Sequence, residues 1–116
     1  MWGNEPWDND LAADWFGGLM DNTNLAVQVR EALQIPAPGS PDEYDAASTL
    51  RAAASCLVMM GRVYVWPIND LKSDLALGVR ALEFVLQDEE YIYNDEIRAA
   101  VEEEKKELEE RLAQLA

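Results

Sequence analysis

The sequence predicts an all-α fold: one helical domain over residues 1–116, in which four to five helices form an irregular bundle and a Trp-rich N-terminal loop docks on it. Apolar residues recur at helical spacing through most of the chain. Helix-start signals and Pro- or Gly-containing breaks separate these segments. With 116 residues and a hydrophobic fraction of 49%, the chain is large enough to bury a core without metal or disulfide cross-links.

The N-terminal stretch from Trp2 to Trp15 holds three of the four tryptophans. Asp8, Asn9 or Asp10 can cap the helix that follows, which should end near residues 21–22. Its predicted apolar face consists of Leu11, Ala12, Trp15, Phe16 and Leu19. Because tryptophan buries a large apolar area, we expect these rings to dock on the core. On this hypothesis, Trp15→Ala costs about 3–5 kcal/mol of stability.

A second helix is predicted after Thr23 or Asn24, with Leu25, Val29 and Leu33 inward, and the Pro-rich segment 35–39 ends it. The third helix has the clearest start signal, because residues 40–43, Ser-Pro-Asp-Glu, read as a capping box with Pro at the first helical position. We expect this helix to continue to Met60 as the central, most buried one. Gly61 is expected to close it in the left-handed conformation.

Residues 62–68 alternate and are rich in β-forming side chains, but a lone strand would have no partner. We therefore predict an extended connector that lays Val63, Val65 or Trp66 over the helices. Asn69 or Asp70 can cap a fourth helix that stops near Asp88. A fifth helix follows. The predicted inward residues of these two helices are Leu71, Leu75, Val79, Leu82 and Leu86, then Ile97, Val101, Leu108, Leu112 and Leu115.

Charge is the strongest compositional bias. There are 23 acidic and nine basic residues and no His, which gives a formal net charge of −14. Residues 1–22 contribute −5 and residues 88–116 contribute −7. We expect these two ends to lie close in space if the last helix packs across the first. Such a surface repels nucleic acid and anionic membranes and favours a basic protein partner.

Localisation and chemistry follow from what the sequence lacks. No segment reaches the roughly 18 apolar residues of a membrane helix, and no signal peptide is recognisable, so we expect a cytoplasmic protein. A single Cys, Cys56, excludes an internal disulfide. Asp8, Asn9, Asp10 and Asp14 lack the ligand spacing of a calcium loop. With no nucleophile–base pair or phosphate loop either, we predict no enzymatic activity, no metal and no cofactor.

Two aromatic stretches are candidates for partner contact. Tyr91 and Tyr93 stand among acids, which suits a partner rich in Arg and Lys. The predicted partner-binding residues are Glu89, Glu90, Tyr91, Tyr93, Asp95 and Glu96. The other stretch, Trp66-Pro67 with Tyr64, is better explained as a loop folded over the helical core.

The first fifteen residues resemble the opening of a mainly bacterial family, domain of unknown function forty-two fifty-nine, which begins W-G-x-x-x-F-x-N-D-x-A-x-D-W. Trp7 stands where that family has Phe. The matching motif, for which we expect a structural role, comprises Trp2, Gly3, Trp7, Asn9, Asp10, Asp14 and Trp15. The resemblance implies a small, mostly helical domain and implies no activity.

The sequence thus favours a non-enzymatic acidic binding protein, an inhibitor or immunity-type protein that neutralises a basic nuclease or toxin by charge complementarity. The first alternative is a structural protein that self-associates through its apolar helix faces. A metal-binding protein or an enzyme comes third.

Overall fold

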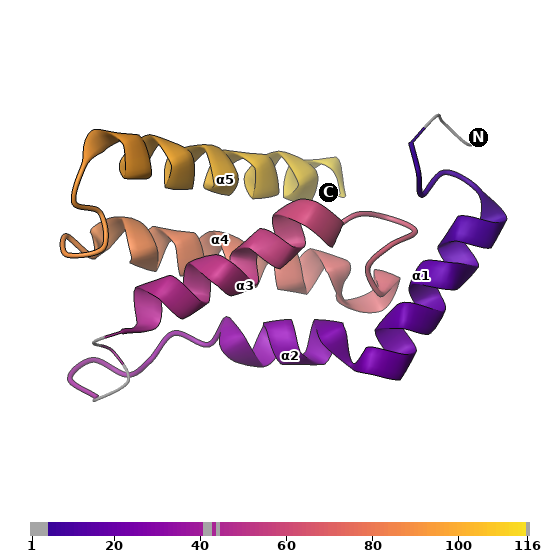
Figure 1. Ribbon diagram of the computed structural model, residues 1–116, viewed down its shortest axis with the longest axis horizontal. Coiled ribbons are helices and arrows are strands. Elements are labelled where there is room, and N and C mark those ends of the chain that lie inside the picture. Colours follow the sequence, from indigo (N-terminus) through magenta and orange to yellow (C-terminus); the bar gives the residue numbers. More distant parts are fainter. Residues whose placement is uncertain (1–4, 41–42, 44, 116) are drawn as a thin grey trace.

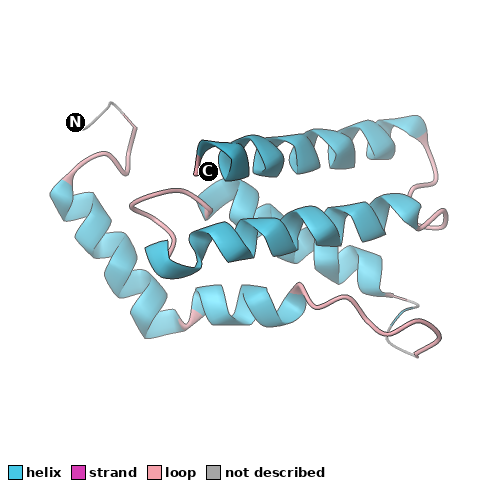
Figure 2. Cartoon of the chain, turned by 180° about the vertical axis from the view of Figure 1, so that it is seen from behind, coloured by secondary structure: helices cyan, strands magenta, loops and turns pink. Residues whose placement is uncertain are grey.

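The computed structural model describes residues 5–40, 43 and 45–115, and within these ranges the chain forms helices and no strand (Figures 1 and 2). The prediction of an all-α fold is confirmed. The five helices are α1 (Asp10–Thr23), α2 (Leu25–Ala32), α3 (Ala46–Met60), α4 (Ile68–Gln87) and α5 (Asp95–Gln114).

The body of the molecule is built from α3, α4 and α5. The last two lie side by side along the long axis, and α3 packs on both of them and on α2 (Figure 1). Gly78 of α4 lies where these helices meet, because a Cβ atom there would be 2.9 Å from Leu108 Cδ1 and 3.0 Å from Leu57 Cδ1. Because glycine has no side chain, α3 and α5 can approach α4 closely here, and the buried leucines of the core pack tightly.

The two acidic ends meet only where the N-terminal loop reaches the end of α5, since Trp7 and Asp8 line one pocket with Arg111, Gln114 and Leu115. The apolar stripe of α5 is covered by α4 and α3, with Val101 and Leu108 fully buried, whereas α1 packs mainly against α2. In Figure 1, α1 lies at one end of a molecule 45 Å long and the α4–α5 turn at the other. The prediction that the last helix packs across the first is therefore wrong.

Helix α1 buries a different side from the one expected. Met20 is buried, and together with Ala13 and Gly17 it faces the connector between α3 and α4. Leu11 is 83% exposed and Trp15 is 63% exposed. Of the predicted face, Phe16 packs against the core, whereas no other described segment covers Leu11 and Trp15. The prediction that Trp15 is a buried structural anchor is wrong.

Trp15→Ala should therefore change the free energy of unfolding by less than about 1 kcal/mol, since exposed side chains contribute little to stability. Met20→Ala is the matched control on the same helix, and there the loss of a buried side chain should cost about 2 kcal/mol or more. Urea titration of both variants measures the difference. A Trp15→Ala variant as unstable as Met20→Ala would contradict the exposed placement.

The helix starts were predicted with mixed success. Asn9 caps α1 as expected, because its side-chain oxygen accepts a hydrogen bond of 2.9 Å from the amide of Ala12. Asn24, with φ of 53°, is the single residue between α1 and α2, a left-handed position that Asn tolerates. Helix α3 begins at Ala46 instead of residue 41, and the carboxylate of Glu43 accepts the amide of Gly39 instead of capping a helix. Residues 41, 42 and 44 lie outside the described part of the chain.

Gly61 follows α3 as predicted, but not in the left-handed conformation. Its φ is −77°, and a Cβ atom there would be 2.5 Å from the carbonyl oxygen of Leu57. A glycine is needed for this close approach, because the Gly61 amide donates to that carbonyl at 2.7 Å. Helix α4 begins directly after Pro67 without the predicted side-chain cap from Asn69 or Asp70.

The connector from Gly61 to Pro67 folds over the core, as the sequence indicated. Val65 and Trp66 are buried, with Trp66 only 2% exposed, so the prediction of a core-covering loop is confirmed for these two residues. The segment is a turn and not extended, because the amides of both residues bond to the carbonyl of Arg62 and Tyr64 has φ of 75°. Helix α4 then runs to Gln87, with Asp88 as its cap, close to the predicted end.

Candidate acidic binding site

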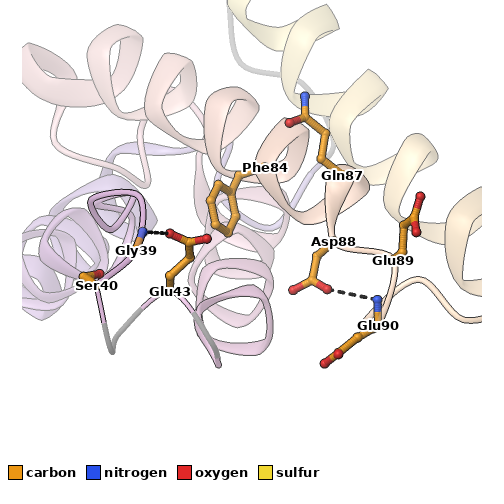
Figure 3. Close-up of a pocket in the computed structure, with 8 residues that line it drawn as sticks. All are labelled: Gly39, Ser40, Glu43, Phe84, Gln87, Asp88, Glu89 and Glu90. Carbon is orange, nitrogen blue, oxygen red and sulfur yellow. Dashed lines mark hydrogen bonds between the residues drawn. The ribbon is translucent and has the colours of Figure 1, made fainter.

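An open cleft of about 670 Å³ lies between Gly39, Ser40 and Glu43 on one side and the C-terminal end of α4 on the other (Figure 3). Residues from two distant parts of the sequence meet there. It is lined by Gly39, Ser40, Glu43, Phe84, Gln87, Asp88, Glu89 and Glu90.

The local sequence fixes both walls of the cleft. On one side, Glu43 folds back onto its own turn by accepting the amide of Gly39. On the other, Asp88 ends α4, and its Oδ1 accepts the amides of Glu90 and Tyr91, each at 3.1 Å. This Asx-type turn directs the chain away from the helix axis and places Glu89 and Glu90 at the rim.

The chemistry of the cleft suits a cationic side chain. Four of its eight lining residues are acids and none is Lys or Arg. In Figure 3, the ring of Phe84 lies between Glu43 and Asp88. A guanidinium group suits this environment, because it donates hydrogen bonds to carboxylates and stacks on aromatic faces. The cleft is therefore a candidate site for Arg or Lys side chains of a partner.

The structure brings together only part of the predicted partner-binding set. Glu89 and Glu90 line the cleft, while Tyr93, Asp95 and Glu96 are exposed beyond it. Asp95 and Glu96 belong to the first turn of α5, where negative charge meets the positive end of the helix.

Tyr91 differs from the expectation of an exposed contact residue. It is half-buried, and its hydroxyl oxygen accepts a hydrogen bond of 3.1 Å from Arg51. The same guanidinium holds Glu104 through bonds of 3.0 and 2.6 Å, and these bonds raise the pKa of Arg51. Tyr91 thus ties the α4–α5 turn to α3.

Sequence reasoning missed Glu43 and Phe84. Glu43 was assigned to a helix cap, and more than forty residues separate it from Glu89, so no local pattern links them. Phe84 is half-buried on the last turns of α4. Asp88 directly precedes the predicted pair and could have been included from its position alone.

Three of the six arginines form close ion pairs within the described part of the chain. Arg51 pairs with Glu104, Arg30 with Asp74 and Arg111 with Glu107. Hydrogen bonding to Asp74 raises the pKa of Arg30.

The residues of the N-terminal motif have different environments in the structure. Trp7 is half-buried and lies 4.6 Å from the Arg62 guanidinium, a cation–π contact that docks the loop on the body. Asn9 caps α1, whereas Asp10, Asp14 and Trp15 are exposed. Trp2 and Gly3 lie outside the described residues.

The described residues contain no candidate metal cluster and no candidate membrane-spanning helix. In residues 5–40, 43 and 45–115, no three His, Cys, Asp or Glu side chains are grouped to hold a metal ion. Across the same part of the chain, no helix has the length and hydropathy needed to cross a membrane.

Fold and cleft together define a small acidic all-α domain. The chain belongs to the family described as "Domain of unknown function (DUF4259)", which matches it over residues 1–116. No curated protein and no solved structure matches the chain.

Proposed function

We propose that this protein is a non-enzymatic acidic binding protein of the inhibitor or immunity type, which neutralises a basic partner such as a nuclease or toxin. The observation that carries the proposal is the cleft, which is lined by Glu43, Asp88, Glu89, Glu90 and the ring of Phe84 and by no Lys or Arg. A Lys/Arg-rich groove on a nuclease binds phosphates, and a fixed set of carboxylates can occupy the same groove.

The net charge of −14 supports the proposal through the rate of association. Such a field attracts a basic protein over about a Debye length, roughly 8 Å at physiological salt. Association should therefore be faster at low salt than at high salt. The cleft would then supply the orientation that diffuse attraction alone lacks.

The test uses an Arg-Gly repeat peptide as a defined basic probe, titrated by calorimetry at low salt. Replacing Glu43, Glu89 and Glu90 together with Gln should weaken binding by about tenfold, because each lost charge-assisted hydrogen bond removes a specific contact.

The matched control replaces Glu102, Glu103 and Glu110, three exposed acids of α5, with Gln. Both variants lose the same charge, so a control that weakens binding equally would show diffuse attraction and contradict a role for the cleft. An untargeted pull-down with the wild-type protein and both variants as bait then identifies the natural partner. A partner that is acidic at its contact surface would refute the proposal.

A second candidate function, self-association, is favoured by one groove. It lies between α4 and α5, encloses about 790 Å³ and includes the apolar side chains of Ala76, Val79 and Leu112. Sedimentation equilibrium decides between the two. A concentration-dependent dimer that Val79→Lys abolishes would support self-association through this groove.

A further inference from the structure

The outer side of α1 carries two parallel stripes of opposite character. Leu11, Trp15 and Leu19 recur every four residues and form an apolar stripe. Asp10 and Asp14 directly precede the first two of these residues, and Asp21 lies a further two turns along the same side, so the acids run beside the apolar stripe. All three acids are exposed.

The apolar stripe has no cover within the described part of the chain. Leu11 and Trp15 are 83% and 63% exposed, while Leu19 is half-buried but does not belong to the packed core. Phe16 supports the indole of Trp15 from the side that faces the core, with ring centroids 5.2 Å apart in an edge-to-face arrangement. A supported, exposed tryptophan is typical of the residues that dominate binding energy at interfaces.

From this arrangement we propose that α1 is a second docking surface, which binds an amphipathic helix of a partner protein that presents an apolar strip flanked by Lys or Arg. The stripes on α1 match such a helix in both parts: apolar side chains meet Leu11 and Trp15, and basic side chains meet Asp10, Asp14 and Asp21. This inference goes beyond the proposed function and does not depend on the cleft, because α1 and the α4–α5 turn lie at opposite ends of the molecule (Figure 1).

Charge argues against a second copy of this chain as the occupant. In a two-fold dimer the same patch faces itself, so the acidic stripes of two α1 helices would adjoin. Residues 1–22 contain five acids and no Lys or Arg, so no base on this segment would offset the repulsion. A basic partner avoids this electrostatic repulsion, and its charge accelerates association.

The probe is a synthetic 14-residue peptide of Leu and Lys, patterned so that Leu occupies one helical face. Its control is a permuted peptide of identical composition that segregates no such face. We expect the amphipathic peptide to bind on the order of tenfold more tightly than the permuted one. Titration should also shift the NMR signal of the Trp15 indole N–H, which Trp15→Phe identifies by its disappearance.

Two sets of variants locate the surface. Replacing Leu11 and Trp15 with Ser should weaken peptide binding on the order of tenfold, while Asp14→Asn with Asp21→Asn should reduce its salt dependence. Tyr93→Ser is the matched control, because Tyr93 is equally exposed but lies after α4, at the far end.

Three results would overturn the inference: equal binding of the permuted peptide, an unmoved Trp15 signal at saturation, or a wild-type dimer that the Leu11 and Trp15 variant abolishes. The wild-type NMR titration needs no folded variant, so the inference stays testable if a variant unfolds. Failure of the Arg-Gly peptide at the cleft leaves these results unaffected, which separates the two proposals.

Discussion

Asp74→Ala should lower the free energy of unfolding by about 3–5 kcal/mol, because it removes a buried carboxylate that accepts from both Arg30 and the Trp66 indole, leaving the indole N–H without its acceptor and Arg30 with Asp70 alone. Asp74 is 1% exposed on α4. Its two oxygens accept bonds of 2.8 Å each from Nε and Nη2 of Arg30, and Oδ2 also accepts the Trp66 indole N–H at 2.9 Å. One carboxylate thus joins α2 and the α3–α4 connector to α4.

The matched control is Asp70→Ala, one turn earlier on the same helix. Asp70 contacts the same guanidinium at 3.2 Å, but its side chain is about half exposed, so its loss should cost less than about 1 kcal/mol. Urea unfolding followed by fluorescence reports both variants, and Asp74→Asn keeps the shape while removing the charge. Equal stability of the Asp70 and Asp74 variants would show that the buried pair is not what holds α2 in place.

The sequence carried a signal for Asp74 that pattern reading did not use. Leu71, Leu75 and Gly78 are buried on one side of α4, and position 74 belongs to the same side because residues three and four apart are neighbours on a helix. A lone acid in a buried stripe requires a hydrogen-bonded partner. Its identity, Arg30, depends on how α2 packs on the body, which no local pattern specifies.

The presence of the helices could be predicted because their sequences show strong apolar periodicity, as in α4 from Leu71 to Leu86. The start of α3 could not be predicted, because Glu43, whose amide donates to the Ser40 carbonyl, lies before the helix, which begins only at Ala46. Local capping signals describe which conformations a segment favours. The packing of α3 against α4 and α5 decides where the helix actually starts.

Helix α1 shows a different limit. Leu11 and Trp15 have the spacing of a core face, yet the structure leaves them exposed. Periodicity says that a face is apolar and not whether this chain or another one covers it. The same ambiguity makes the face informative once the structure is known, because an apolar stripe without an internal cover identifies a surface for a partner.

Only some of the residues that line the candidate cleft could be predicted from the sequence. Glu89 and Glu90 stand out in the sequence as acids beside a helix end. Glu43 and Phe84 complete the cleft because Gly39, Ser40 and Glu43 lie near the end of α4, and this placement depends on tertiary contacts. The acidic composition predicted the charge of the site but not its location.

Arg111→Ala should destabilise the protein by about 1.5–3 kcal/mol, the range for hydrogen bonds to a charged group. Arg111 of α5 donates to the carbonyl oxygens of Leu57 and Val58 at 2.7 and 2.6 Å, at the C-terminal end of α3. The Leu57 carbonyl also accepts the Gly61 amide, and a cation beside the last carbonyls of α3 meets the negative end of the helix. Burial lowers the pKa of Arg111, but arginine stays protonated at neutral pH.

Because the guanidinium can donate several hydrogen bonds at once, a lysine substitution distinguishes hydrogen bonding at this site from the effect of charge alone. Arg111→Lys keeps a cation near the end of α3 but cannot reach both carbonyls and Glu107, which accepts from Nη2 at 2.7 Å, so it should recover only part of the loss. Arg98→Ala, an exposed change on the same helix, should cost under about 0.5 kcal/mol. In thermal melts, Arg98→Ala should therefore have the highest melting temperature of the three variants, Arg111→Lys an intermediate one and Arg111→Ala the lowest. Full recovery by Lys would mean that charge alone, and not the paired hydrogen bonds, holds α5 to the end of α3.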